Sequence, residues 1–190
     1  MRALSVRLAS LLLLLAPAAA FAHPGHTGSH WMQGLSHPIM GLDHLLAMLA
    51  VGIWAAQQSG MLRWAIPVGF VASMFAGVML ASAGVHLPQV EVGIVFSVIA
   101  FGVAIAFSAR SQMALIAVTA FAVFHGHAHG TEAAQSMDPS YVLGIMSATA
   151  TLHLVGMGIG LVAQRRVGVS APRWAGATIA LSGLALAVGA

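Results

Sequence analysis

The hydrophobic residues of this chain gather into six long runs that are separated by short polar segments. The runs cover residues 38–56, 62–84, 90–108, 112–129, 140–163 and 173–189. Each run is near the ~20 residues that an α-helix needs to cross the hydrocarbon core of a bilayer. The pattern predicts an all-α membrane protein, with a bundle of about six transmembrane helices in residues 37–190.

A further apolar run at the N-terminus has the features of a targeting signal. Two arginines precede the run 11–15, and the sequence Ala20-Phe21-Ala22 follows it. This order is typical of a secretory signal peptide with an A-x-A cleavage site. We expect residues 1–22 to be removed, so that the mature chain begins at His23. An uncleaved signal anchor is the alternative, although the run is short for a span.

Arginines and acids fall in different loops of the predicted bundle. The loops after the first, third and fifth spans hold the arginines of the mature chain, which are Arg63, Arg110, Arg165, Arg166 and Arg173. Positively charged loops stay in the cytoplasm. We therefore expect both mature termini in the periplasm, and a multi-pass protein of the bacterial inner membrane.

Composition excludes several classes of protein. The chain is 59% hydrophobic and 6% charged, whereas a soluble domain carries about a quarter of its residues as charges. Its net charge of +3 comes from dispersed arginines, so we reject nucleic acid as a partner. The absence of cysteine excludes disulfides, thiolate metal sites and cysteine nucleophiles. No G-x-x-x-x-G-K-[ST] motif is present for nucleotide binding, so transport would draw on a gradient or on another chain.

A first metal-type motif, His37-Pro38-Ile39-Met40-Gly41-Leu42-Asp43-His44, opens the first predicted span. Pro38 suits the first position of a helix, which would place His37 and His44 about two turns apart on one face. Asp43 would ligate from the side or hold an imidazole in one tautomer. An Asp-His pair inside an apolar helix is costly, which favours a functional role over a structural hydrogen-bonded pair.

A second motif, His125-Gly126-His127-Ala128-His129, ends the fourth predicted span. His125 and His129 are four residues apart and share one helical face, and Glu132 follows one turn later. This span runs outward, so its end meets the start of the first span at the same membrane depth. The sequence therefore predicts one metal site that is formed by His37, Asp43, His44, His125, His129 and Glu132.

The donor atoms narrow the choice of metal. Nitrogen and carboxylate ligands suit Ni²⁺, Co²⁺ or Zn²⁺, whereas Mg²⁺ and Ca²⁺ prefer oxygen ligands alone. Met40 and Met48, which flank His44, leave a copper(I) site as an alternative. We expect the ion to be the transported substrate, with no permanently bound cofactor.

The segment 23–36 is predicted to be a periplasmic arm that contains three histidines, His23, His26 and His30. Short tracts rich in histidine bind metal weakly. We interpret the arm as a device that concentrates ions, with a disordered leader as the alternative.

Three further residues are secondary candidates. His127 would be a solvent-facing relay or a residue without a special role. His153 would be the next station of an inward path, or a histidine hydrogen-bonded to a neighbouring helix. Glu91 would concentrate cations at the outer face or favour a helix N-terminus.

Three segments together resemble the HupE/UreJ family of nickel permeases. They are His37-Pro38-x-x-Gly41-x-Asp43-His44, Leu87-Pro88-x-Val90-Glu91-x-Gly93 and Phe124-His125-Gly126-x-Ala128-His129-Gly130-x-Glu132. The resemblance covers the whole chain. It implies import of Ni²⁺ from the periplasm to the cytoplasm, in support of hydrogenase or urease maturation, by a protein that is not an enzyme. It also implies functional roles for His37, Asp43, His44, Glu91, His129 and Glu132.

The residues themselves leave other functions open. A cobalt or zinc transporter would use the same ligands. An intramembrane zinc enzyme could use Glu132 or Asp43 as a base, and a haem protein could use His44 and His153 as axial ligands. Two histidine motifs near the outer surface favour ion capture. The expected partners are the lipid bilayer and a divalent metal ion, and the sequence leaves a homo-oligomer open.

Overall fold

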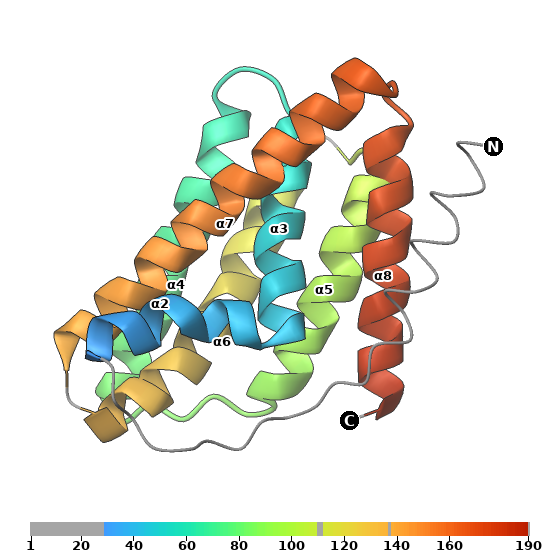
Figure 1. The fold of residues 1–190 in the computed structure, drawn as a ribbon. Coiled ribbons are helices and arrows are strands. Elements are labelled where there is room, and N and C mark those ends of the chain that lie inside the picture. Colours follow the sequence, from blue (N-terminus) through green and yellow to red (C-terminus); the bar gives the residue numbers. More distant parts are fainter. Residues whose placement is uncertain (1–28, 110–111, 137, 190) are drawn as a thin grey trace.

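The computed structural model describes residues 29–109, 112–136 and 138–189. Regular structure in these ranges is helical, which confirms the all-α prediction (Figure 1). The helices are α2 (His30–Met40), α3 (Leu42–Ala56), α4 (Leu62–Ser82), α5 (Val90–Ala106), α6 (Gln112–Ser136), α7 (Pro139–Arg166) and α8 (Ala171–Gly189). The predicted signal peptide 1–22, the arm residues His23 and His26, and Arg110 lie outside the described residues.

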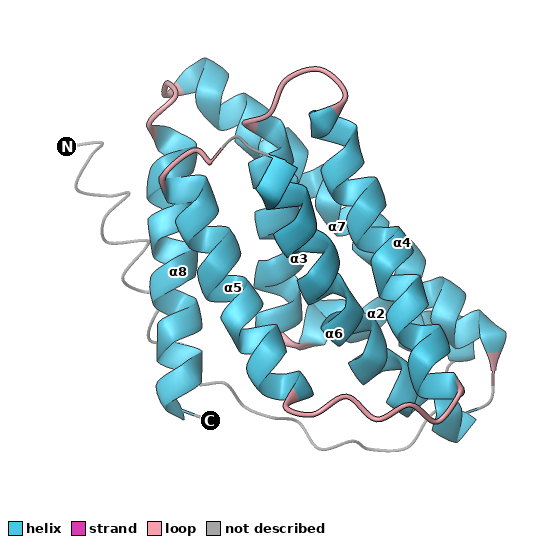
Figure 2. Cartoon of the chain, turned by 180° about the vertical axis from the view of Figure 1, so that it is seen from behind, coloured by secondary structure: helices cyan, strands magenta, loops and turns pink. Residues whose placement is uncertain are grey.

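The helices form an up-and-down bundle in which α3 is the central element (Figures 1 and 2). α3 is packed against α4, α5, α7 and α8, while α4 pairs with α6 and α5 pairs with α8. Nearly every residue of α3 from Ala47 to Ala56 is buried. A helix that is apolar on all sides is stable only when other helices or lipid surround it.

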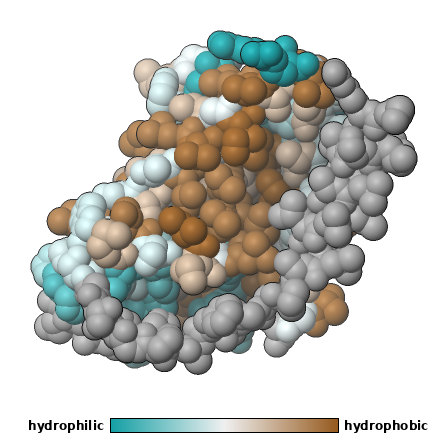
Figure 3. All heavy atoms as spheres, viewed as in Figure 1, coloured by the Kyte–Doolittle hydropathy of each residue, from teal (hydrophilic) through white to brown (hydrophobic). Residues whose placement is uncertain are grey.

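The membrane character follows from the helix lengths and hydropathy. α4, α7 and α8 are each long and apolar enough to span a bilayer, and α2 with α3 could form one broken span. α5 is a shorter apolar helix, and α6 carries three histidines in its second half. Figure 3 shows hydrophobic side chains over the middle of one face and polar side chains toward the two ends. The number of six spans and the periplasmic placement of the termini stay predictions.

The first predicted span differs from the structure. The chain is already helical from His30, so residues 30–36 of the predicted arm lie in α2, and Pro38 is inside α2 rather than at a helix start. Gly41 is extended, with φ −88° and ψ 119°, and α2 and α3 meet there at 81°. The prediction that His37 and His44 share one face of a continuous helix is therefore wrong.

Asp43 lies at the start of the new helix that follows Gly41. Its carboxylate lies in the first turn of α3 and accepts the backbone N–H of His44 at 2.7 Å. The first N–H groups of a helix have no partner within the helix, and negative charge is favourable there. The carboxylate therefore stabilises the first turn of α3.

The two ends of the bundle carry different side chains. The arginine end holds Arg63, Arg165, Arg166 and Arg173, near the C-termini of α3 and α7 and the N-termini of α4 and α8. The opposite end, which we call the histidine end, contains α2, the start of α3 and the second half of α6 (Figure 1). The segregation of described arginines to one end agrees with the loop pattern in the sequence.

Glycines allow close approach of the paired helices. A Cβ atom at Gly126 in α6 would collide with the main chain of Met74 in α4, and one at Gly77 would collide with Val123. The same relation holds between α3 and α7, where Gly52 lies against His153 and Gly156 lies against Leu49. Small residues at such positions are typical of helix packing in membranes.

We expect Gly126→Ala to lower the thermal stability of the purified protein in detergent. The added methyl group would meet backbone rather than a flexible side chain, and overpacking of this kind costs about 1–3 kcal/mol. Gly158→Ala is the matched control on α7, because nothing lies within 4 Å of its Cβ position. Alanine is the better helix former, so the control should unfold at an equal or higher temperature. Equal stability of the two variants would contradict the packing account.

Candidate metal centre

Four histidines from three helices meet at the histidine end. They are His37 from α2, His44 from α3, and His125 and His129 from α6, and we call them the histidine cluster. The ring centroids of His44 lie 4.7 Å from His129, 5.0 Å from His125 and 6.2 Å from His37. The His37 and His129 centroids are 5.0 Å apart. The structure thus brings together the two motifs that are distant in the sequence.

Glu132 completes the solvent-accessible side of the cluster. One donor atom each from His37, His129 and Glu132 lies within 4.8 Å of the others, close enough to hold one metal ion. The Glu132 Oε2 atom is 3.1 Å from His37 Nε2 and 3.8 Å from His129 Nδ1. The Glu132 side chain is 45% exposed and that of His37 is 31% exposed, whereas His129 is buried. These three residues, the Glu132 triad, form the exposed mouth of the cluster.

The Asp43 carboxylate holds the His44 ring in one tautomer. Asp43 Oδ1 lies 2.9 Å from His44 Nδ1. A carboxylate accepts hydrogen bonds, so Nδ1 carries the proton and Nε2 keeps a lone pair. That Nε2 atom is buried and has no hydrogen-bond partner within the described part of the chain. Of the two roles predicted for Asp43, the geometry shows the one that orients an imidazole.

Ser97 of α5 plays the corresponding part for His125. The Ser97 hydroxyl donates to the Ile94 carbonyl at 2.6 Å, so its oxygen accepts from His125 Nε2 at 2.9 Å. His125 Nδ1 is then the nitrogen with the lone pair, and it is buried without a partner in the described ranges. An imidazole that donates one N–H to an oxygen and presents its other nitrogen is the usual form of a metal ligand.

Two predicted candidates lie away from the cluster. His127 is buried rather than solvent-facing, and its Nε2 lies 2.7 Å from the Val85 carbonyl and 3.3 Å from the Leu87 amide. It braces the loop between α4 and α5. His153 is also buried, and its Nδ1 donates to the Met48 carbonyl of α3 at 2.8 Å.

His30, the arm histidine within the described residues, is at the start of α2. Its Nδ1 lies 3.8 Å from a carboxylate oxygen of Asp138, the N-cap of α7. The Ser140 backbone N–H donates to Asp138 at 2.8 Å, and this hydrogen bond lowers the pKa of the Asp138 carboxyl below its usual value. This pair connects α2 to α7 rather than to the cluster.

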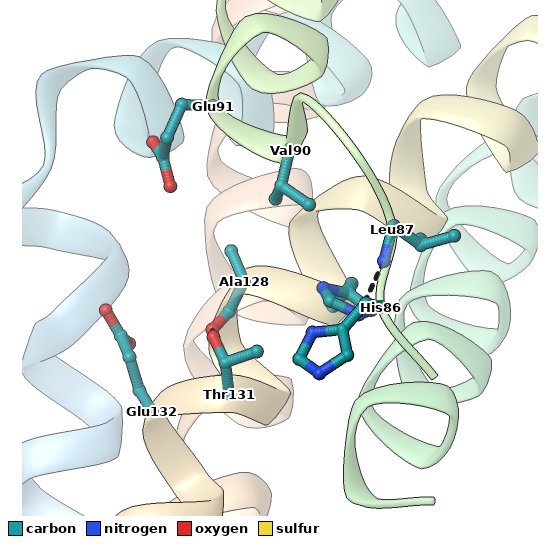
Figure 4. Close-up of a pocket in the computed structure, with 8 residues that line it drawn as sticks. His86, Leu87, Val90, Glu91, Ala128, Thr131 and Glu132 are labelled. Atoms are coloured by element: carbon teal, nitrogen blue, oxygen red, sulfur yellow. Dashed lines mark hydrogen bonds between the residues drawn. The ribbon is translucent and has the colours of Figure 1, made fainter. Parts of the chain in front are cut away.

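A pocket of about 270 Å³ opens beside the Glu132 triad. It is lined by residues of the α4–α5 loop, α5 and α6, among them His86, Glu91 and Glu132. Figure 4 shows the Glu91 and Glu132 side chains on the same side of this pocket, with their carboxylate ends turned toward each other. Glu91 is exposed, so its carboxylate adds negative charge at the mouth.

Hydrogen bonds join the C-terminal end of α3 to the end of α5 and to Ala109 at the arginine end of the bundle. Trp54 Nε1 and Gln58 Nε2 donate to the Ala109 carbonyl at 2.9 and 3.0 Å, and Gln57 Nε2 donates to Ile105 at 3.0 Å. Trp54, Gln57 and Gln58 are all buried. The exposed side chains of the cluster and its triad, His37 and Glu132, lie at the opposite end.

Comparison with known proteins identifies the family of this chain. The family model for HupE / UreJ protein matches residues 11–186. The chain is a member of the HupE/UreJ family. It is 40% identical over 183 residues to Protein HupE of Rhizobium leguminosarum bv. viciae, an alignment that covers 95% of this chain and 96% of that protein. No solved structure matches the chain. The resemblance drawn from the sequence motifs is confirmed for this HupE/UreJ protein.

Sequence reasoning missed two residues that position the site. Tyr141 of α7 donates its hydroxyl to Glu132 Oε2 at 3.2 Å, and Ser97 orients His125. The tyrosine could have been suspected, because it is the single tyrosine of the chain and stands near the start of a span. Ser97 carries no such signal, since an isolated serine within an apolar run is common in membrane helices.

Proposed function

We propose that this HupE/UreJ protein imports Ni²⁺ from the periplasm to the cytoplasm through the centre of the helix bundle. The observation that carries the proposal is the convergence of the histidine cluster and Glu132 at one end of the bundle. Buried nitrogen donors that lack hydrogen-bond partners are unusual in native structures and call for an explanation. Binding of a divalent metal ion that prefers imidazole and carboxylate ligands explains these nitrogen atoms.

The geometry supports a capture step at the Glu132 triad. The ion would first meet the carboxylates of Glu91 and Glu132 at the pocket mouth and would then exchange water for His37 and His129. The Nε2 atom of His44, held ready by Asp43, lies on the buried side of the triad. At His44 the hydrogen bond from Nδ1 to Asp43 leaves Nε2 unprotonated, so binding there needs a lone pair and no proton transfer. At His37, whose Nε2 lies 3.1 Å from Glu132 Oε2, the proton on that nitrogen leaves when the ion binds.

The direction of transport rests on the positive-inside rule. Described arginines at one end of the bundle would place that end in the cytoplasm, and the histidine end would then face the periplasm. The first described helix and the end of α8 both lie at the histidine end (Figure 1). In this orientation both mature termini are periplasmic, and the protein is a multi-pass protein of the bacterial inner membrane.

The family supports a role in metal supply rather than in catalysis. The chain belongs to the HupE/UreJ family, and we propose that it supplies nickel for hydrogenase or urease maturation. Cobalt and zinc remain rival substrates because the donor set suits them as well. An intramembrane zinc enzyme is a rival function, because two histidines and a glutamate also form catalytic zinc sites.

Uptake of ⁶³Ni in cells that lack their own nickel importers tests the proposal. We expect expression of this chain to raise the initial uptake rate, with cobalt and zinc as competitors to rank the substrates. Uptake at the rate of cells with an empty vector would overturn nickel import. Stoichiometric zinc retained through purification would favour the enzyme instead.

Nickel affinity should fall as the pH is lowered from ~7.5 to ~5.5. His37 is the partly exposed histidine of the triad, and the reference pKa of imidazole is about 6.5. A proton on Nε2 occupies the lone pair that would bind nickel, so the loss is at most about tenfold per pH unit for one such group. Titration of the purified protein in detergent measures this without a gradient.

His37→Ala provides the control for the pH dependence, because its affinity should be weaker but less dependent on pH. A wild-type affinity that stays flat down to pH 5.5 would show that His37 is not a ligand. Faster uptake in vesicles at acid outside pH, with falling affinity in detergent, would instead indicate proton co-transport.

A further inference from the structure

Two described histidines outside the cluster, His127 and His153, also have a buried ring nitrogen without a partner, and His153 is the one inside the bundle, because His127 faces the loop between α4 and α5. His153 of α7 is 1% exposed, and its Nδ1 lies 2.8 Å from the Met48 carbonyl oxygen of α3. A carbonyl oxygen only accepts hydrogen bonds, so Nδ1 carries the proton and Nε2 keeps its lone pair. His153 Nε2 is buried and has no hydrogen-bond partner among the residues described.

His44, His125 and His153 therefore follow one pattern. Each donates a ring N–H to a protein oxygen, namely Asp43, Ser97 or Met48, and each leaves its second nitrogen buried and unpartnered. A histidine that served only to join α7 to α3 would need Nδ1 alone. Helix packing does not explain why His153 Nε2 is buried without a partner, because a buried acceptor that accepts no hydrogen bond is unfavourable.

The position of His153 is deeper in the bundle than the cluster. Its partner Met48 follows His44 by four residues on α3, which is about 6 Å toward the arginine end at 1.5 Å per residue. The Phe70 ring of α4 lies beside both levels, with its centroid 5.6 Å from His125 and 5.0 Å from His153. One aromatic ring thus contacts the last cluster histidine and the deeper one.

The surroundings of His153 leave few other donors. Phe70 and Met74 are one turn apart on α4, Thr149 and His153 are one turn apart on α7, and the Thr149 hydroxyl approaches the Met74 sulfur at 3.7 Å. Thr149 is buried as well. An ion at this level would therefore have His153 as its nitrogen ligand.

We propose that His153 Nε2 is an inner station for the divalent cation, which passes from His125 to His153 beside the Phe70 ring. This inference rests on the proposed nickel transport. In the step, the coordinate bond to His125 breaks as the bond from the His153 lone pair forms. Both histidines stay neutral, and the step needs no electron or proton transfer.

His153→Asn separates a station from a structural histidine. The asparagine Nδ2 atom takes the place of imidazole Nδ1 and can still donate to the Met48 carbonyl, but the variant has no atom in place of Nε2. We expect the initial rate of ⁶³Ni entry into vesicles to fall at least about tenfold at saturating nickel. Nickel affinity in detergent should stay within about twofold, because the cluster is intact. Thr151→Ala, on an exposed face of α7, is the matched control and should transport normally.

Entry at the wild-type rate in His153→Asn, with wild-type protein active, would overturn the inner station and leave nickel import standing. Inactive wild-type protein would overturn the proposed function itself. If His153→Asn unfolds at a lower temperature than wild type, His153→Gln is the second variant, with an amide group that reaches the Nε2 position. A weak amide ligand should give partial transport, and a full rate in this variant would also contradict the station.

Discussion

Replacement of His44 by alanine should abolish nickel uptake and leave the amount of protein in the membrane unchanged. His44 stands at the centre of the histidine cluster, within 5.0 Å of His125 and 4.7 Å of His129 by ring centroids. Its Nε2 atom is buried and has no hydrogen-bond partner among the described residues, and histidines of both motifs lie around its ring. We expect the initial ⁶³Ni uptake rate to fall by about 100-fold or more, as for the loss of a ligand and its oriented ring.

Asp43→Ala should give a large but smaller loss, because it removes the carboxylate that orients His44 rather than the ligand itself. Loss of such a partner costs about 10–100-fold in metal affinity. Met40→Ala is the matched control: Met40 ends α2 within the same motif, but it is 75% exposed. Normal uptake by His44→Ala and Asp43→Ala would contradict the site, and a loss in Met40→Ala would revive the copper alternative.

Glu132→Gln should lower nickel affinity at least about tenfold, because an amide oxygen replaces the charged oxygen of the triad. The glutamine keeps the size of the side chain and can still accept from the Tyr141 hydroxyl, so the helix ends should stay in place. Affinity of the purified variant, measured by titration in detergent, reports this loss directly.

Tyr141→Phe serves as the graded comparison for Glu132→Gln. It removes the hydroxyl that donates to Glu132 Oε2 but keeps the charge of the carboxylate. Its loss of affinity should therefore be smaller than that of Glu132→Gln. A larger loss in Tyr141→Phe would show that Glu132 acts as a structural partner of the tyrosine rather than as a ligand.

Much of the architecture was accessible from the sequence, because apolar runs of span length have few alternatives to helices in a membrane. The meeting of His44 with His125 and His129 followed from the opposite directions of the first and fourth runs. Alternation of direction along the chain is a strong constraint when connections are short. The prediction therefore held across about eighty residues of intervening sequence.

The bend at Gly41 could not be read from the sequence. Pro38 suits the first position of a helix, so the sequence favoured a helix start there. In the structure α2 begins earlier, at His30, with Ser29 as its N-cap. What decides the geometry is tertiary packing of α2 across α7, where Gly34 and Gly144 allow the two backbones to approach. His37 reaches the cluster because of the bend and not because of helical spacing.

His127 shows a second limit of reasoning from helical faces. Its position on α6 is offset from the His125–His129 pair, which on an isolated helix would turn it toward solvent. The loop between α4 and α5 covers that side of α6, and Val85 and Leu87 bind the ring. Loop conformation is set by contacts that no periodicity in the sequence records.

The central claim is that the histidine cluster conducts nickel through this HupE/UreJ protein. Its most direct test is the initial rate of ⁶³Ni entry into liposomes that contain only the purified chain, beside liposomes with the His44→Ala variant. We predict saturable entry with the wild-type protein and entry with the variant at the rate of protein-free liposomes. Entry that is equal in wild type and variant, or wild-type entry no faster than in protein-free liposomes, would contradict the account.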